Sequence, residues 1–293
     1  MLQSIHPMEI QKQLEETLGE SLTDSCLTTG KTTTLSGKVY FLKTGPVSHT
    51  YLCEAHSLRE IATAKVIRTP KVIAAGENFL LTEFIESGHA DTSFFQTLGI
   101  QLARLHRITS EAYGFYEDNY IGANPQSNLP EAKESSDWAL FYFNKRLLFQ
   151  YKLAESRGLV TSDLKSGIHF LEKHTYRILQ GSNEPPTLLH GDLWAGNYLC
   201  SSQGEPVLID PAVYYGHRGA DLAMTRLFGG FAPEFYRAYQ QTYLLQPQWE
   251  YRENLYKLYH VLNHLNLFGR SYLAEAEYLM RFYRNPTQYP GYT

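Results

Sequence analysis

The sequence has few cysteines, little net charge and no long apolar run. Its three cysteines are Cys26, Cys53 and Cys200, and a number so small and odd favours reduced thiols over a disulfide framework. The formal net charge is -4 and Lys and Arg form no run, which argues against nucleic acid and anionic membranes as partners. Neither a run of about 18 apolar residues nor a secretory leader pattern is present. We therefore expect a cytoplasmic protein that binds no nucleic acid and no membrane.

What the sequence does contain is the composition of a folded globular protein. Hydrophobic residues make up 43% and charged residues 19% of the 293 positions, which is ordinary for such proteins. This length suffices for one large domain or for two lobes with a core each. No internal repeat or low-complexity tract is visible, and we expect a monomer.

The chain has two parts with different patterns of apolar residues. Residues 22–85 contain short β-branched segments separated by Gly, Ser and Pro, namely "CLTTG", "KVYFLKT", "KVIAAG" and "FLLTEFI". One stretch among them, "TYLCEAHSLREIATAK", has apolar residues at helical spacing. From Ser93 onward the spacing is mostly helical. Helices are predicted in "FFQTLGIQLARLHRI", "DWALFYFNKRLLFQYKLAE", "LKSGIHFLEKHTYRIL", "EFYRAYQQTYLL" and "ENLYKLYHVLNHLNLFG".

This division predicts an α+β protein of two lobes. The smaller, β-rich N-terminal lobe would span residues 1–86, and the larger, mainly helical C-terminal lobe residues 87–293. The lobes would join near "TEFIESG".

The stretch "LLHGDLWAGNYL", residues 188–199, puts polar side chains directly after an apolar run. Asn197 follows Asp192 by five residues, and Asp210 ends the next apolar run in "PVLIDPA". The runs "TLLHGDLW" and "PVLIDPA" lie on either side of the turn "CSSQGE", so we predict a hairpin-like ribbon. Such a ribbon would deliver all three side chains to one end.

Carboxylate and amide oxygens at one place indicate phosphoryl-transfer chemistry. Mg²⁺ is usually held by one or two carboxylate or carbonyl oxygens together with substrate phosphates, and a further carboxylate can take the proton of an attacking hydroxyl. Gly191 and Gly196 would permit unusual backbone angles that aim these side chains into a cleft. The stretch is therefore interpreted as a catalytic loop.

Longer motifs connect the chain to a known family. "HGDLWAGN" and "LIDPA" resemble the catalytic and metal-binding loops of the protein-kinase-like fold. "HGDLWAGNYL", "PVLIDPAVYYGHRGADLAMTRLFGGF", "LYHVLNHLNLFG" and "DNYIGANPQSN" resemble the fructosamine kinase family, also called ketosamine kinases. This resemblance, from about residue 20 to 276, implies ATP-dependent phosphorylation of a sugar hydroxyl on a small-molecule or protein-bound ketosamine. The phosphorylated adduct would then come off, which repairs glycation.

The resemblance also implies roles at the reacting centre. Asp192 would be the base that orients and deprotonates the acceptor hydroxyl, while Asn197 and Asp210 would hold Mg²⁺. Flat aromatic faces would pack against the sugar, and His264 would be a further substrate contact. The aromatic candidates are Trp194, Tyr214 and Tyr215.

ATP would bind through residues of the N-terminal lobe. By the same resemblance, Lys43 would reach the α- and β-phosphates and pair with Glu54, with Glu60 as the alternative partner. The connection between the lobes would hydrogen-bond the adenine edge through the backbone of Glu83, Phe84 and Ile85.

Two places depart from the family pattern. Paired glycines over the phosphates are replaced by Asp24 and Ser25 in "TDSCLTTG", which bears on nucleotide affinity. His217 and Gly219 stand where acidic residues are common in the family, which bears on substrate preference.

Other interpretations of single motifs are weaker. "TTGKTTT" resembles the end of a P-loop, but Ser25 stands where that motif needs glycine and no helix pattern follows. His260 and His264 have zinc-ligand spacing on a helix without a third ligand nearby, so we expect them to line the cleft or fill the core. Cys26 is either an inert loop cysteine or a redox-sensitive thiol.

Alternatives for the whole protein also remain. A kinase of the same fold for another alcohol, such as an aminoglycoside or choline, would share the catalytic loop. A non-catalytic nucleotide-binding regulator would fit the missing loop glycines but not the intact set of Asp192, Asn197 and Asp210.

Overall fold

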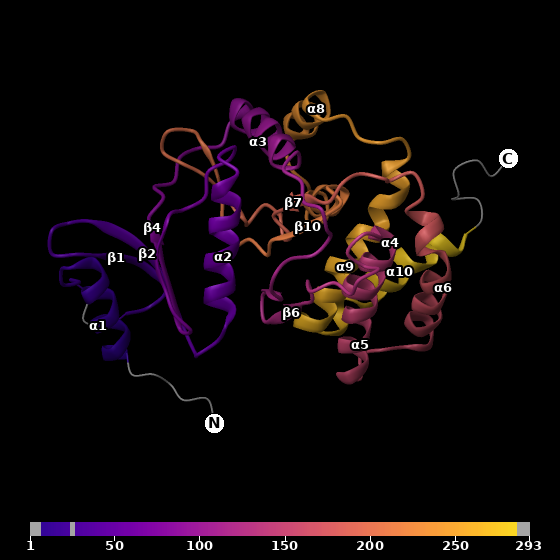
Figure 1. Ribbon diagram of the computed structural model, residues 1–293, viewed down its shortest axis with the longest axis horizontal. Helices are drawn as coiled ribbons and strands as arrows, with labels where there is room; N and C mark the ends of the chain where they lie inside the picture. Colours follow the sequence, from indigo (N-terminus) through magenta and orange to yellow (C-terminus); the bar gives the residue numbers. More distant parts are fainter. Residues whose placement is uncertain (1–6, 24–26, 286–293) are drawn as a thin grey trace.

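The N-terminal part of the protein is built on one antiparallel sheet. A computed structural model describes residues 7–23 and 27–285 (Figure 1). The sheet has the strand order β1-β2-β4-β3, and all neighbouring strands are antiparallel. Its strands are β1 (Gly30–Thr33), β2 (Val39–Thr44), β3 (Val72–Ala75) and β4 (Phe79–Glu83). Two helices accompany it, α1 (Pro7–Leu18) and α2 (Thr50–Thr63).

Different helices cover the two faces of this sheet. Successive side chains of a strand point to opposite faces, and β4 shows the result. Leu81 packs in one cluster with Leu14 of α1, whereas its neighbour Leu80 packs with Leu58 of α2. The same alternation in β2 puts Leu42 in the α1 cluster and directs Lys43 toward α2.

The rest of the chain is mainly helical. Its principal helices are α3 (Thr92–Leu105), α4 (Trp138–Tyr142), α5 (Phe149–Ser156), α6 (Ser162–Ile178), α7 (Gly219–Thr225), α8 (Pro233–Thr242), α9 (Trp249–Phe268) and α10 (Leu273–Arg284). A π-helical segment, Phe143–Leu148, joins α4 to α5, and a short 3₁₀ turn, Arg270–Tyr272, precedes α10. None of the described helices is both long and apolar enough to cross a membrane.

Helix α9 is the centre of this part. It packs against α5, α7 and α10, and its buried residues lie on every side of the helix, as expected for a helix inside a core. At the edge of this core α3 and α8 lie side by side (Figure 1). Gly99 permits their close approach, because a Cβ there would meet the carbonyl oxygen of Phe235 at 2.4 Å.

Three two-stranded ribbons complete the described structure. They are β5 (Asn119–Ile121) with β6 (Asn124–Gln126), β7 (Thr187–Leu189) with β10 (Tyr214–Gly216), and β8 (Tyr198–Cys200) with β9 (Pro206–Leu208). The predicted pairing of the runs before Asp192 and Asp210 is therefore wrong. The run before Asp192 is β7, which pairs with β10, and the run before Asp210 is β9, which pairs with β8.

Most element predictions are confirmed. The structure has the predicted α+β composition, and each predicted helical stretch contains a helix. The first strand was predicted in "CLTTG", which is too early in the chain. The observed β1 starts at Gly30 and lies in "TTGKTTT", the stretch that resembles a P-loop. Helices α1 and α10 were not predicted. Asp24, Ser25 and Cys26 lie outside the described residues, so the structure does not test the predictions about them. The proposed lobe boundary after residue 86 lies in the connection between β4 and α3.

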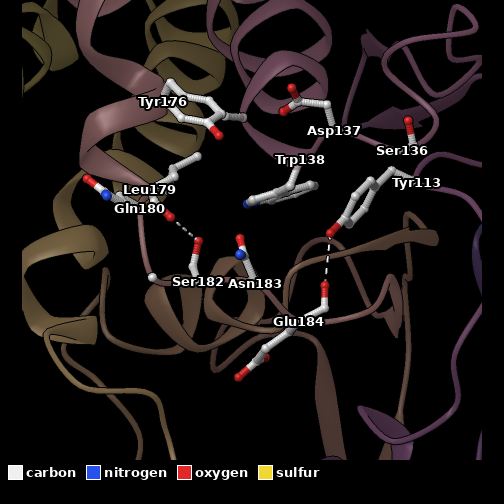
Figure 2. A pocket seen from close by; sticks show the side chains of 12 residues that line it. Tyr113, Ser136, Asp137, Trp138, Tyr176, Leu179, Gln180, Ser182, Asn183 and Glu184 are labelled. Carbon is white, nitrogen blue, oxygen red and sulfur yellow. Dashed lines mark hydrogen bonds between the residues drawn. The ribbon is translucent and has the colours of Figure 1, made fainter.

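A polar cavity of about 720 Å³ opens between α4, the end of α6 and residues 180–184 (Figure 2). Several of its polar side chains already have structural partners. Asp137 caps α4 by accepting from the N–H of Leu140 at 3.1 Å, and the Ser182 hydroxyl donates to the carbonyl of Leu179. Size alone therefore does not make this cavity a catalytic site.

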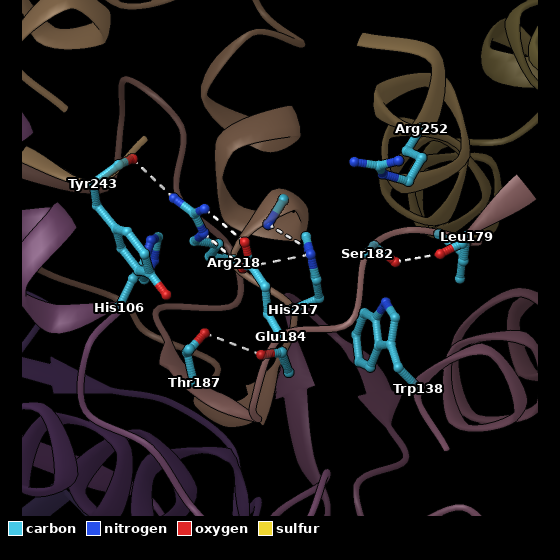
Figure 3. A network of polar contacts seen from close by, with 12 residues as sticks. His106, Trp138, Leu179, Ser182, Glu184, Thr187, His217, Arg218, Tyr243 and Arg252 are labelled. Atoms are coloured by element: carbon cyan, nitrogen blue, oxygen red, sulfur yellow. Dashed lines mark hydrogen bonds and ion pairs between the residues drawn. The ribbon is translucent and has the colours of Figure 1, made fainter. Parts of the chain in front are cut away.

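A buried ion pair lies beside this cavity (Figure 3). Arg218 donates to both carboxylate oxygens of Glu184, at 2.7 and 2.6 Å, and to the carbonyl oxygens of Tyr243 and Leu244. His217 also faces Glu184, at 3.5 Å, and burial lowers its pKa to about 4. His217 does not line the cavity around Asp192, and its ring stacks on that of Tyr256 at 5.7 Å.

Removing the cation of this pair should destabilise the fold strongly. Arg218→Ala leaves Glu184 buried without its partner, and we expect the free energy of unfolding to fall by about 3–5 kcal/mol in urea denaturation. Arg237→Ala is the matched control, because Arg237 pairs with Glu234 on the surface, and it should cost less than about 1 kcal/mol. Equal losses for the two variants would contradict this assignment.

Candidate active site

The catalytic loop is fixed by a buried carboxylate. Asp221 of α7 accepts the backbone N–H groups of His190 and Gly191 at 2.7 and 2.9 Å, and His106 Nε2 lies 3.2 Å away. Burial by itself would raise the pKa of Asp221, but the contacts with His106, His190 and Gly191 lower it below its usual value. An ionised Asp221 therefore holds the two residues that precede Asp192.

The two glycines of the loop serve different purposes. Gly191 has a positive φ of +85°, and a Cβ there would meet the carbonyl oxygen of Ala212 at 1.9 Å. Gly196 lies beneath the ring of Trp194, where a Cβ would meet ring carbons at 2.4 Å. The expected unusual backbone angle is present at Gly191, whereas Gly196 is needed for the close approach of the indole.

Asp192 projects from this loop with one oxygen free. Asn197 Nδ2 donates to the backbone oxygen of Asp192 at 2.7 Å and to its Oδ2 at 3.2 Å. Oδ1 is buried without a hydrogen-bond partner, and the nearest cation-forming group is His260 Nδ1 at 3.9 Å. Burial raises the pKa of Asp192 to about 7; Asn197 opposes this shift, and the charges of Asp210 and Asp221 add to it. The carboxyl group can thus accept a proton near neutral pH.

Asp210 lies opposite, in contact with the N-terminal sheet. Its φ of +55° is unusual for a non-glycine residue. Its Oδ1 accepts from Lys43 Nζ at 2.6 Å, and the same Nζ donates to Glu54 Oε1 at 2.7 Å. Burial would lower the pKa of Lys43, but these two carboxylates raise it, so the side chain stays charged. One ammonium group therefore joins β2, α2 and the segment that follows β9.

The structure distinguishes Glu54 from the alternative partner. Glu60 is on the same helix but accepts from the hydroxyl of Tyr215 at 2.8 Å. Tyr215 therefore contacts α2. Both contacts fasten α2 to the rest of the protein, and only the Glu54 contact involves Lys43.

Two cavities meet at this lysine. One, of about 240 Å³, lies between the sheet and the β8–β9 ribbon and has a mainly apolar lining that includes Leu80, Leu199 and Ile209. Glu83, Phe84 and Ile85 also line it. The other, of about 340 Å³, is lined by Asp192, Asn197, Asp210, Cys53 and the β5 strand. Lys43, Glu54 and Asp210 border both cavities.

The oxygen ligands beside these cavities suit a hard divalent cation. Because Asn197 Nδ2 donates to Asp192, its Oδ1 remains as a possible ligand. Asp210 is half-exposed, with 44% of its side chain accessible, and contacts Lys43 through only one carboxylate oxygen. Such a pair of oxygen ligands is what Mg²⁺ uses when substrate phosphates complete its coordination.

Aromatic rings gather near the catalytic loop. The indole of Trp194 is 40% exposed and meets Phe228 edge-on at 6.2 Å, and Phe228 meets His264 at 4.9 Å. His264 Nδ1 donates to the carbonyl oxygen of His260. Trp194 and His264 thus belong to one aromatic group, and the sequence analysis missed its middle member, Phe228. None of the three side chains lines either of the two cavities.

Tyr214 lies elsewhere. Its side chain is 2% exposed, and the guanidinium of Arg146 stacks on its ring at 3.9 Å. The predicted substrate contact by Tyr214 is therefore not supported, because the ring fills the core instead of facing a cavity. Its β10 neighbour Tyr215 points to α2.

Long-range packing places two further polar residues, Asp221 and His260, at this site. The role of Asp221 was not predicted, although a charged residue in the apolar stretch "GADLA" is a signal of a buried polar contact. His260 was expected to line the cleft or fill the core, and its approach to Asp192 depends on the packing of α9.

Comparisons with known proteins agree with this geometry. Residues 3–285 match the family model described as fructosamine kinase. The chain is 38% identical over 249 residues to a probable ketoamine kinase of Enterococcus faecium, covering 83% of this chain and 87% of that protein. It is 38% identical over 269 residues to a chloroplastic protein-ribulosamine 3-kinase of Oryza sativa subsp. japonica, covering 87% and 75%.

Solved structures support the fold. The crystal structure of a candidate fructosamine-3-kinase from Thermobifida fusca YX-ER1 matches with a TM-score of 0.82 and 29% identity, covering 93% of this chain and 97% of that chain. The streptomycin-ATP-APH(2")-IIa complex matches with a TM-score of 0.60 and 16% identity, covering 95% and 97%, and so shares the fold alone. The predicted protein-kinase-like fold is confirmed.

Ionisation of Asp192 should cost stability. Its folded pKa of about 7 exceeds the ordinary 3.8, so the folded state binds this proton more tightly and loses stability as pH rises from about 4 to 7. Asp192→Asn cannot ionise. We expect this variant to be more stable than the parent by about 2–4 kcal/mol above pH 7, with a gain that shrinks steadily toward pH 5.

Urea unfolding without nucleotide or divalent cations, at several pH values, measures this difference. Asp163→Asn is the matched control, because Asp163 is an exposed carboxylate of α6, and it should show no such trend. A gain for Asp192→Asn that is equal at pH 5 and pH 8 would refute the assigned pKa.

Proposed function

The chain belongs to the fructosamine kinase family, and we propose that it transfers the γ-phosphate of ATP to a sugar hydroxyl of a ketosamine, small or protein-bound. The observation that carries this proposal is the convergence of Lys43, Asp192, Asn197 and Asp210 on the two joined cavities. A cation for phosphates, a proton acceptor and oxygen ligands for Mg²⁺ are the parts that phosphoryl transfer requires. Cytoplasmic location and the monomeric state stay predictions.

ATP binds with its adenine in the 240 Å³ cavity. Leu80 and Ile209 offer apolar contacts from the sheet and from the β8–β9 ribbon. Among the described residues, the N–H of Ile85 has no hydrogen-bond partner, which leaves it available to an adenine nitrogen. The carbonyl of Glu83 lies two residues before it and can accept from the base. The phosphates then extend toward Lys43, which borders both cavities.

Asn197 and Asp210 would hold Mg²⁺, which supplies charge neutralisation at the phosphates when bound. Lys43 adds a second positive charge. Glu54 orients Lys43, because the ion pair fixes Nζ at the border of the two cavities. Glu54 is therefore a positioning residue, and its loss should act through the nucleotide.

Asp192 receives the proton of the acceptor hydroxyl. Its Oδ1 has no partner in the described structure, while Oδ2 is held by Asn197. A hydroxyl donating to the Asp192 carboxylate attacks the γ-phosphorus in line; the bond from phosphorus to the ADP oxygen breaks, and the proton passes to Asp192. Because the pKa of Asp192 is about 7, its carboxylate is a stronger base than an ordinary aspartate, and about half of the molecules carry it ionised at pH 7.

The acceptor packs against the aromatic group of Trp194, Phe228 and His264. The exposed indole gives a flat apolar face suited to the C–H face of a sugar. This group is open to solvent at Trp194, which leaves room for the amine part of the ketosamine, whether an amino acid or a protein side chain.

An acceptor panel tests the proposed function. ADP release is measured with ATP and Mg²⁺ on fructose-, ribulose- and erythrulose-lysine, an aminoglycoside, choline and no acceptor. We expect turnover on ketosamines only, and a decrease of about 10²- to 10⁴-fold in Asp192→Asn with ATP binding retained. Asp163→Asn is the control.

Other outcomes reject the proposal. Turnover confined to the aminoglycoside or choline would assign a different alcohol to the same fold. ATP binding without turnover on any acceptor would indicate a nucleotide-binding regulator.

The two glutamates of α2 provide a second test. Glu54→Gln should lower kcat/KM for ATP by about tenfold, or ~1.4 kcal/mol, because Lys43 loses its orienting partner. Glu60→Gln, on the same helix, removes only the contact with Tyr215 and should stay within about twofold of the parent. Steady-state kinetics with varied ATP measures both; similar losses would show that α2 acts as a whole and that the Lys43 contact is not special.

A further inference from the structure

A second group of possible metal ligands lies at the start of α2, apart from the oxygen ligands of the catalytic site. The ligand atoms of His49, Cys53 and Glu117 are all within 4.8 Å of one another. His49 is exposed, Glu117 is half-buried and Cys53 is 1% exposed. None of these three side chains has a role in the proposed phosphoryl transfer.

Local structure explains how the group forms. His49 is the N-cap of α2 and Cys53 follows four residues later, so both side chains lie on the same helix face one turn apart. Glu117 comes from the segment before β5. That segment is held against α2, because the Cys53 thiol donates to the carbonyl oxygen of Asp118 at 3.5 Å.

A fourth residue orients the carboxylate. His56 lies one further turn along α2, and its Nδ1 donates to Glu117 Oε1 at 2.8 Å. One oxygen of Glu117 is therefore fixed by a neighbour, as is usual for carboxylates that bind metals. The spacing His-x3-Cys-x2-His, with a carboxylate from another segment, thus supplies three ligands and one supporting contact.

We propose that His49, Cys53 and Glu117 bind one zinc-type cation. An imidazole nitrogen, a thiolate sulfur and a carboxylate oxygen form a borderline-soft set that favours Zn²⁺ over Mg²⁺. In a tetrahedral zinc site the ligand atoms lie about 3.3–3.8 Å apart, so the group needs to contract by roughly 1 Å. Rotation of the exposed His49 side chain can supply this. The thiol proton of Cys53 is released to solvent as the metal–sulfur bond forms, and water takes the fourth position.

The cation would fasten α2 to the segment before β5. Cys53 borders the same cavity as Glu54, the next residue along the helix. A metal at Cys53 therefore acts on the helix that positions Lys43. The proposal does not depend on the identity of the acceptor, because it concerns binding and stability only.

Cobalt(II) provides a spectroscopic test, since thiolate–Co²⁺ charge transfer absorbs in the near ultraviolet. The full chain carrying Cys26→Ser and Cys200→Ser keeps Cys53 as its single cysteine. We expect one equivalent of Co²⁺ to produce the band in this variant, and Zn²⁺ to abolish it by displacement. Cys53→Ser alone should lack the band, while Asp210→Asn should keep it and so separate this site from the oxygen ligands of the catalytic cavity.

Zinc binding by competition with a chromogenic chelator gives a second readout. His49→Ala and Glu117→Gln should each weaken Zn²⁺ binding at least about tenfold, and His56→Ala by about 10- to 100-fold if it orients Glu117. His169→Ala, an exposed histidine of α6, should have no effect. Because His49 is exposed, its variant should fold even if Cys53→Ser does not. A parent protein without the charge-transfer band, or zinc affinity unchanged in both His49→Ala and Glu117→Gln, would overturn the proposal.

Discussion

The buried carboxylate of Asp221 is the constraint on which the catalytic loop depends. An unpaired charge in the core would cost several kcal/mol, so Asp221 is stable there only with its donors in place. Two of these donors are consecutive backbone N–H groups, those of His190 and Gly191, and satisfying both fixes the path of the chain into Asp192. Gly191 is required because this path brings it against the backbone of Ala212. The same charge helps to raise the pKa of Asp192, so one group both places and tunes the proposed base.

The second constraint is an excess of negative charge. Glu54 and Asp210 contact Lys43, and Asp192 lines one of the same cavities. Lys43 is the only basic residue among the described residues that line the two cavities. Lys43 is shared between Glu54 and Asp210, and Asp192 reduces the repulsion through its raised pKa. Such an arrangement is favourable only if further positive charge arrives. A phosphoryl-transfer site that receives its divalent cation together with the nucleotide satisfies this condition.

The sequence predicted those parts of the site that depend on short spacing. Asp192 and Asn197 are five residues apart in one loop, so local geometry brings them together. The pairing of Lys43 with a glutamate of the next helix came from the resemblance, which left Glu54 and Glu60 open. Long-range packing decided the rest. Both Glu54 and Glu60 are on α2, and only the rotation of the helix against β2 selects one for Lys43. Tyr214 and Tyr215 are equivalent in the sequence, but alternation along β10 sends the first into the core and the second to α2. The β7–β10 pairing joins segments that the hairpin pattern could not connect.

Helix α2 belongs to both halves of the structure. Leu58 packs under the sheet with Leu80, whereas Ile61, less than one turn later, belongs to the large core of the helical part. Polar contacts also join α2 to both parts, because Glu54 contacts Lys43 of β2 and Glu60 contacts Tyr215 of β10. The proposed cation at Cys53 would add a third attachment at the start of the helix. If that cation binds better when α2 is in the position that orients Lys43, nucleotide binding must strengthen cation binding by the same factor, since coupling between two sites is reciprocal. The binding of both ligands would then depend on the position of α2.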